Sequence, residues 1–190
     1  MKKILLALLI LLTCVGCNKK NDDINYTYDI ISKDVDMSGY EGVSSTQHMF
    51  KGITVDQLFN CIDLKSSGVF YLGRTNCGCC QTCCKYLNEA ATKLGVTVYY
   101  IDVYDKDMPL NTTEICDKLK QYIYDILDTV DGEKELQTPT VFTVINGEFA
   151  DHMICMNNQA WSTPPTEKEI AKLTDRYIEM LKPFSSENQD

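Results

Sequence analysis

One stretch decides the fold: Val69-Phe70-Tyr71-Leu72-Gly73-Arg74-Thr75-Asn76-Cys77-Gly78-Cys79-Cys80. Its first four residues form a continuous apolar, β-rich run, as in a strand that is buried on both faces of a sheet. After the cysteines, apolar side chains recur at helical spacing from Cys80 to Leu94, and Gly95 ends the pattern. The sequence therefore predicts a buried strand, a turn that carries Cys77 and Cys80, and an amphipathic helix.

The flanking sequence predicts further strands and helices. Val96 to Val103 predicts a second strand, which completes a β-α-β unit around the cysteine turn. Asn146-Gly147 is the strongest short signal for a β-hairpin, and Thr54 and Thr166 each begin a capping box. The other predicted elements are a helix from Thr54 to about Ser66, a helix from Glu114 to about Val130, strands Val141–Ile145 and Phe149–Ile154, and a helix from Thr166 to about Leu181.

This order of elements resembles the thioredoxin fold. The resemblance covers about Thr54 to Leu181 and includes a CxxC pair at a helix start and the segment Thr138-Pro139-Thr140 before a strand. It implies an α/β fold with a central mixed sheet flanked by helices, preceded by an N-terminal extension. Within this superfamily, residues 73–80 are similar to those of bacterial bacteriocin transport accessory proteins and related thioredoxin-like lipoproteins.

The resemblance also implies roles for four residues. Cys77 matches the nucleophilic cysteine of the superfamily and Cys80 its resolving cysteine. Pro139 matches the proline that is usually cis and faces the disulfide, and Thr138 precedes it, so both are expected to contact substrate. The chain departs from the pattern at Tyr71, which stands where thioredoxins place a buried acid, and it has no Trp before Cys77.

The position of the cysteines suits thiol chemistry. A thiolate attacks a disulfide, and free backbone N–H groups at a helix N-terminus stabilise that anion. Cys80, one helical turn further on, is placed to attack a mixed disulfide on Cys77 and release the substrate. Arg74 either assists the thiolate electrostatically or is an ordinary surface residue. We expect this chemistry to need no cofactor and no metal.

The remaining cysteines leave alternatives open. Cys80-Gln81-Thr82-Cys83 is a second CxxC pair, but it lies a turn deeper in the helix. Cys83 and Cys84 fall on the apolar stripe and are expected in the core. Cys79 either exchanges disulfide partners with the pair, acts as a regulatory thiol or has no role. Alternatively, Cys77, Cys80 and Cys84 converge on Zn or Cu(I).

Other candidate groups have no assigned role. His48 and His152 are expected to be ordinary surface or hydrogen-bonded histidines, with no sign of a Cys-His protease. Cys61, Cys116 and Cys155 each lie in or beside a predicted element, and their pairing is not readable from the sequence.

The start of the chain resembles an export signal. Met1-Lys2-Lys3 is basic, Ile4 to Leu12 is apolar but shorter than a membrane span, and Cys14-Val15-Gly16-Cys17 resembles a bacterial lipobox. Cys17 is then the lipidated residue; the alternative is ordinary cleavage that leaves a free thiol. The expected divisions are a signal peptide over 1–16, a lipidated tether over 17–25, an N-terminal extension over 26–53, a thioredoxin-like domain over 54–182 and a tail over 183–190.

The charge excludes one class of function. The net charge is −9, and it becomes about −11 once Lys2 and Lys3 are removed with the signal. Nucleic acid is therefore not an expected partner. The expected partners are thiols and disulfides of exported proteins or peptides, the membrane through the lipid anchor on the extracytoplasmic face, and a membrane redox or transport protein. The alternatives are a metal-binding lipoprotein and a non-catalytic accessory to peptide or bacteriocin export.

Overall fold

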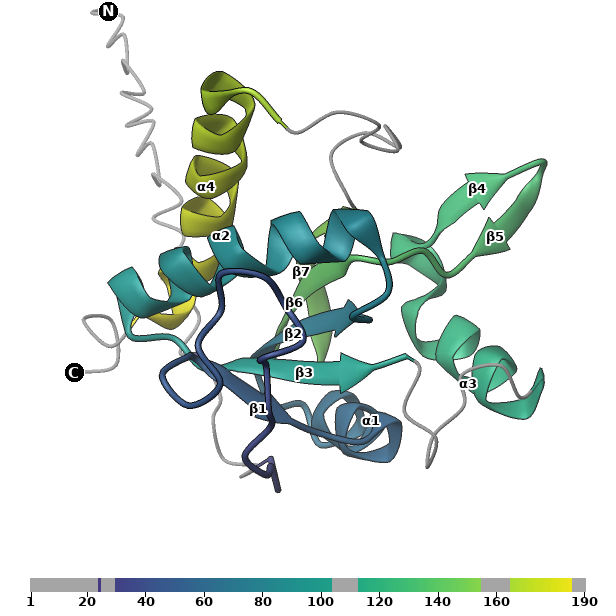
Figure 1. The fold of residues 1–190 in the computed structure, drawn as a ribbon. Helices are drawn as coiled ribbons and strands as arrows, with labels where there is room; N and C mark the ends of the chain where they lie inside the picture. The colour runs from purple at the N-terminus through teal and green to yellow at the C-terminus, as the bar shows by residue number, and fades with distance from the viewer. Residues whose placement is uncertain (1–23, 25–29, 104–112, 155–164, 186–190) are drawn as a thin grey trace, which may run out of the picture.

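A five-stranded sheet is the centre of the molecule. The computed structural model describes residue 24 and residues 30–103, 113–154 and 165–185. The strands lie in the order β1-β3-β2-β6-β7 (Figure 1). Their bounds are Phe50–Gly52 for β1, Gly68–Gly73 for β2, Val98–Asp102 for β3, Thr140–Ile145 for β6 and Glu148–Ile154 for β7.

The sheet is mixed, as predicted. β3 pairs parallel with both β1 and β2, whereas β6 runs antiparallel to β2 and β7 antiparallel to β6. All six residues of β2 are buried, which confirms the expectation of a strand covered on both faces. The predicted hairpin is also confirmed, because Asn146 and Gly147 take positive φ angles of 55° and 82° between β6 and β7.

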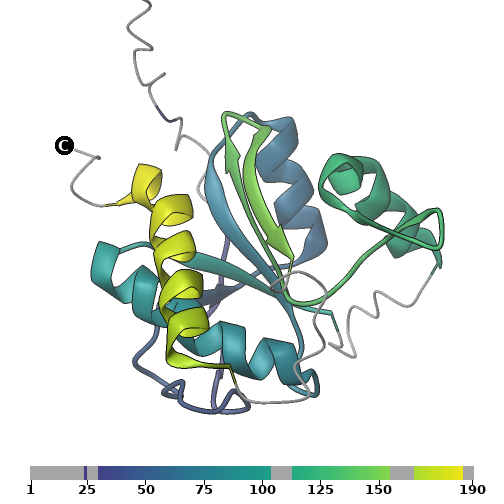
Figure 2. The ribbon, with the colours of Figure 1, turned by 90° about the horizontal axis from the view of Figure 1, so that it is seen from above.

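Helices cover both faces of the sheet. Their bounds are Val55–Asp63 for α1, Gly78–Leu94 for α2, Thr113–Ile123 for α3 and Glu167–Leu181 for α4. α2 and α4 pack on one face, and α1 lies on the other (Figures 1 and 2). α3 contributes Leu119 and Ile123 to the core on the α1 side. This arrangement is the thioredoxin-like fold that the order of elements predicts.

The helix ends follow the sequence signals closely. Thr54 and Thr166 each cap a helix, and the glutamine or glutamate three residues later completes a capping box in both. Gly95 ends α2 in the left-handed conformation, with φ of 66°.

The predicted helix from Glu114 to Val130 is wrong at its C-terminal end. α3 ends at Ile123, and the short 3-10 helix η1 (Tyr124–Ile126) leads into a hairpin of β4 (Asp128–Val130) and β5 (Glu133–Glu135). Asp131 and Gly132 form its turn, with φ of 49° and 91°. An Asp-Gly pair favours such a turn, so this local signal outweighs the helical spacing of the apolar residues.

The N-terminal extension contributes to the sheet and the core. β1 belongs to it, and the sequence pattern did not predict this strand. Met37, Tyr40 and Val43 are buried in the cluster that also contains the cysteines of α2. Lys33 makes an isolated antiparallel bridge with Gly52.

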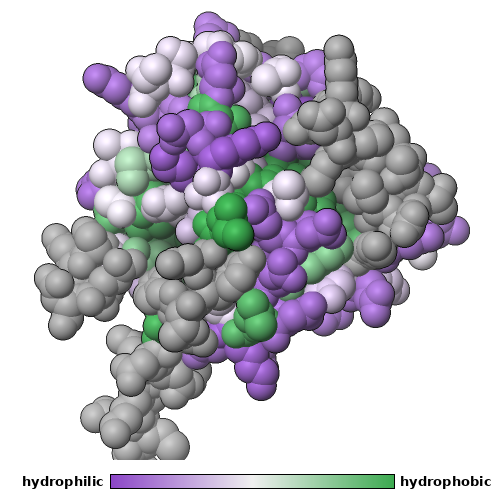
Figure 3. All heavy atoms as spheres, turned by 90° about the horizontal axis from the view of Figure 1, so that it is seen from below, coloured by the Kyte–Doolittle hydropathy of each residue, from purple (hydrophilic) through white to green (hydrophobic). Residues whose placement is uncertain are grey.

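Few large hydrophobic side chains lie on the surface of the described parts. Ile31, Leu64 and Tyr124 are more than half exposed. On the face that Figure 3 shows, hydrophobic residues lie among hydrophilic ones. Among the residues that the structure describes, none of the helices has the length and apolar character to cross a membrane. The predicted signal peptide and Cys17 lie outside these residues.

Candidate active site

Cys77 is the N-cap of α2, directly after the turn that leaves β2. Its backbone is extended, with φ of −113° and ψ of 119°, and its Sγ accepts a hydrogen bond of 3.3 Å from the backbone N–H of Cys80. Sulfur therefore occupies the place that a serine or aspartate oxygen commonly takes at a helix start. A negative charge on this sulfur faces the free N–H groups of the first helical turn.

These contacts lower the pKa of Cys77 to about 5. The largest contribution is a hydrogen bond from the Cys80 thiol, and the Cys80 backbone amide adds to it, while partial burial opposes both. Arg74 adds a weaker electrostatic contribution in the same direction, which agrees with the first of the two roles considered for it. Near neutral pH, Cys77 is therefore a thiolate, which is the form that attacks disulfides.

Cys80 has the opposite character. Its side chain is fully buried, with an exposed fraction of 0%. Its pKa lies well above the ordinary value, first because its thiol donates a hydrogen bond to Cys77 and then because burial disfavours the anion. The pair thus combines a partly exposed thiolate with a buried thiol that keeps its proton.

Thr138 and Pro139 lie beside Cys77. The pairing of Leu72 with Thr140 places the start of β6 next to the end of β2. The peptide bond between Thr138 and Pro139 is cis, and the Thr138 carbonyl oxygen lies 3.5 Å from Cys77 Sγ, from which it accepts a hydrogen bond when Cys77 is protonated. The structure therefore brings together the four site residues that the sequence singled out within the domain.

Gln81 joins the cysteine turn to the N-terminal extension. Its Nε2 donates to the carbonyl oxygens of Gly39 and Thr75, and its Oε1 accepts from the backbone N–H of Glu41 at 2.7 Å. Sequence reasoning missed this role, because residues 39–41 belong to a segment whose pattern is weak. The Gln81 side chain thus holds the turn before Cys77 against residues 39–41 of the N-terminal extension.

Three tyrosines pack in the same buried cluster as Cys80 and Cys84. The hydroxyls of Tyr40 and Tyr100 are 3.0 Å apart, and Tyr71 packs against both rings. Burial raises the pKa of all three phenols above the ordinary value. Neutral aromatic side chains thus fill the space where thioredoxins are expected to bury an acid.

The other described cysteines are less suited to act as thiolates at the surface. Cys83 and Cys84 are buried, as their place on the apolar stripe predicts, and burial raises the pKa of Cys84. Burial also raises the pKa of Cys61 to about 11. Cys79 is half-buried beside the core. The Cys116 side chain and all of Cys155 lie outside the described residues.

The structure describes both histidines, His48 and His152, and the cysteines considered as metal ligands. His48 is hydrogen-bonded at both ring nitrogens, to the Val35 carbonyl oxygen and the Phe50 amide, as expected of a satisfied histidine. His152 lies on the exposed side of β7. Within the described ranges, there is no group of three or more His, Cys, Asp or Glu side chains that could hold a metal ion.

Comparison with known proteins gives only distant structural similarity. No family model and no curated protein matches the chain. Among solved structures, "a putative oxidoreductase with a thioredoxin fold" is 12% identical with a TM-score of 0.44, and the match covers 66% of this chain and 93% of that one. Thioredoxin from Trypanosoma brucei brucei is 20% identical with a TM-score of 0.42, covering 69% and 89%. The Schistosoma mansoni thioredoxin pre-protein is 16% identical with a TM-score of 0.41, covering 70% and 99%. The assignment of the fold rests on the strand order and helix positions of this chain.

Proposed function

We propose that this thioredoxin-fold chain is a thiol-disulfide oxidoreductase that acts on cysteines of exported proteins. One observation carries the proposal: the Cys77 sulfur caps the start of α2, 3.3 Å from the Cys80 backbone N–H, and Cys80 supplies a fully buried second thiol beside it. This placement lowers the pKa of Cys77 and raises that of Cys80. This asymmetry gives the two cysteines different tasks, one for attack and the other for resolution.

The proposed reaction uses two exchange steps. The Cys77 thiolate attacks one sulfur of a client disulfide, the client S–S bond breaks, and the other client sulfur leaves as a thiolate that takes a proton from solvent. Cys80 then releases its proton to solvent and attacks Cys77 Sγ. The Cys77–Cys80 bond forms as the mixed disulfide breaks, and the client's second sulfur leaves. Two electrons pass from the pair to the client, and the reverse sequence oxidises a client dithiol.

The place of action is proposed from the sequence. Met1-Lys2-Lys3, the apolar run from Ile4 to Leu12 and the lipobox-like segment ending at Cys17 favour export and lipid attachment on the extracytoplasmic side of the membrane. The resemblance of residues 73–80 to thioredoxin-like lipoproteins and bacteriocin transport accessory proteins agrees with this location. A membrane redox or transport protein is then the expected partner that renews the pair.

Substitution of the two cysteines tests the reaction. The variant Cys77→Ser with Cys80→Ser is expected to lose turnover of a small disulfide, whereas Cys80→Ser alone is expected to accumulate a mixed disulfide on Cys77 that mass spectrometry detects. Cys61→Ala is the matched control, since Cys61 lies in the core cluster on the α1 side of the sheet. Full turnover by the double variant contradicts the proposal.

A second substitution tests the location. Cys17→Ser is expected to move the protein from the membrane fraction to the soluble extracytoplasmic fraction and to remove incorporation of a labelled fatty acid. Unchanged fractionation and labelling of this variant would show that Cys17 is not the anchor, and the redox proposal would stand without it.

A further inference from the structure

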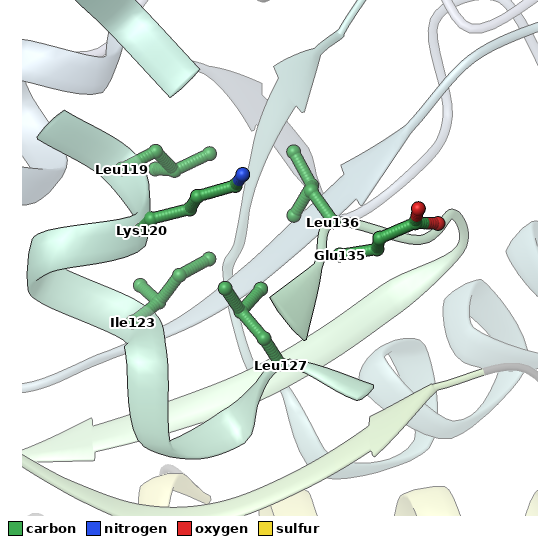
Figure 4. Close-up of a pocket in the computed structure, with 6 residues that line it drawn as sticks. All are labelled: Leu119, Lys120, Ile123, Leu127, Glu135 and Leu136. Atoms are coloured by element: carbon green, nitrogen blue, oxygen red, sulfur yellow. The ribbon is translucent and has the colours of Figure 1, made fainter. Parts of the chain in front are cut away.

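A small apolar pocket lies between α3 and the segment that follows β5. Its volume is about 210 Å³. Figure 4 shows aliphatic side chains from α3 on one side and from the residues after it on the other, facing a common space. The lining residues are Leu119, Lys120, Ile123, Leu127, Glu135 and Leu136.

The pocket has a buried floor, and its rim is more accessible. Leu119, Ile123 and Leu127 are buried and belong to the core on the α1 side of the sheet. The Lys134 ammonium donates a hydrogen bond of 2.7 Å to the Leu127 carbonyl oxygen, which fastens β5 to the end of η1. Leu136 is half-buried and is the lining residue nearest in the chain to Thr138. Because the floor is part of the core, the pocket is already formed before a ligand enters.

The chain itself connects this pocket to the reactive sulfur. Leu136 precedes Thr138 by two residues, so their Cα atoms are at most about 7 Å apart. The Thr138 carbonyl oxygen is 3.5 Å from Cys77 Sγ. A polypeptide bonded to Cys77 advances about 3.3 Å per extended residue. Its residues two to four positions from the bonded cysteine therefore come within reach of the pocket.

The lining chemistry selects the occupant. Four of the six lining residues are aliphatic, and the two charged ones, Lys120 and Glu135, have opposite signs. Such a lining favours an uncharged apolar group and gives no net attraction to an acidic or basic one. For scale, an apolar cavity of about 150 Å³ accommodates benzene, so this pocket has room for a leucine, isoleucine or methionine side chain.

We propose that the pocket binds an aliphatic side chain of the client, two to four residues from the client cysteine that bonds to Cys77. The inference rests on the proposed function and adds to it a sequence preference of the client. The pocket depends on the β4–β5 hairpin, because β5 and the residue after it supply Glu135 and Leu136.

Two kinds of substrate separate this inference from the proposed function. The reduced full chain is mixed either with a small aromatic disulfide that has no peptide part or with synthetic peptides that carry one cysteine as a mixed disulfide. The peptides have Leu, Ala or Asp at position two, three or four from the cysteine. We expect at least one Leu peptide to react roughly tenfold faster than its Asp counterpart, as apolar pocket contacts commonly discriminate.

In Leu136→Arg, the ratio of the Leu-peptide rate to the Asp-peptide rate is expected to fall to about one, with each rate divided by the rate of the same variant with the small disulfide, which corrects for any loss of folded protein. Leu64→Arg is the matched control, because Leu64 is an exposed leucine beyond the end of α1 and is expected to keep the preference. Reaction with the small disulfide without discrimination among peptides overturns the pocket assignment alone. A preference that survives Leu136→Arg does the same. Absence of reaction with every substrate overturns the proposed function, and the pocket assignment with it.

Discussion

The backbone N–H of Cys80 donates a hydrogen bond of 3.3 Å to the sulfur of Cys77. Cys80 therefore supports a negative charge on Cys77 in two ways, because its backbone N–H and its thiol both donate hydrogen bonds to the same sulfur. The pKa of Cys77 thus depends on the position of Cys80.

The first prediction concerns the titration of Cys77. Its alkylation by iodoacetamide should rise with pH around a midpoint near 5, since the folded chain lowers its pKa to about that value. In Cys80→Ala the midpoint should move upward, because the strongest hydrogen-bond donor is lost while the backbone N–H remains. Peptide mapping by mass spectrometry measures both rates. A wild-type midpoint near 8.5, the ordinary cysteine value, contradicts the assignment.

The second prediction concerns the reduction potential. A stabilised thiolate favours the reduced form and makes the disulfide a better oxidant. A Cys77 pKa of about 5 lies between about 7 in thioredoxin and about 3.5 in the most oxidising pairs of this kind. Equilibration with glutathione should therefore give a potential between about −270 and −120 mV. A more negative value than thioredoxin's contradicts this link between pKa and potential.

The third prediction concerns the stability of the reduced protein. The folded state lowers the pKa of Cys77, so this group adds no stability below pH 5 and adds increasing stability up to about pH 8.5. Cys80 acts in the opposite direction above about pH 8.5, because its pKa is raised in the folded state. In the presence of reductant, the free energy of unfolding measured with urea should rise between about pH 5 and pH 8.5 in the wild type but not in Cys77→Ser. Parallel pH profiles for the two proteins would exclude the effect.

The fourth prediction concerns Gly73, at the end of β2. A Cβ there would lie 2.5 Å from the Tyr71 hydroxyl and ring, and Tyr71 is fully buried and not free to move aside. Gly73→Ala should therefore lower the free energy of unfolding by about 1–3 kcal/mol. Gly78→Ala, where nothing lies within 4 Å of the added carbon, should be neutral or slightly stabilising.

A double-mutant cycle tests the cause of this loss. In a Tyr71→Leu background, Gly73→Ala should cost less than in the wild type, because the ring that meets the new carbon is gone. Chemical denaturation measures all four proteins. Equal costs in the two backgrounds would assign the loss to the backbone of β2 rather than to the contact with Tyr71.

Local signals in the sequence predicted most of the fold. Buried β2, amphipathic α2 and the Asn146-Gly147 hairpin each depend on neighbouring residues, and each was confirmed. β1 was missed because its three residues gain their strand structure only by pairing with β3. The predicted end of α3 is wrong because the apolar residues keep helical spacing beyond Ile123, whereas the Asp131-Gly132 pair forms a turn.

The candidate site also contains residues that the sequence predicts and residues that it does not. Cys77, Cys80 and Pro139 were named from motifs and from a resemblance. Gln81 and Tyr40 were not, because their contacts join segments about forty and sixty residues apart in the chain. A single sequence carries no periodic pattern for a contact of that kind.

The contact between Tyr71 and Gly73 also has a meaning for descent. A residue smaller than tyrosine at position 71 would leave room for a side chain at position 73, whereas Tyr71 makes any Cβ there costly. Among homologues, the two positions should therefore change as a pair, with glycine at 73 wherever tyrosine stands at 71. Such covariation would show that this one contact limits which residues evolution can place at both positions.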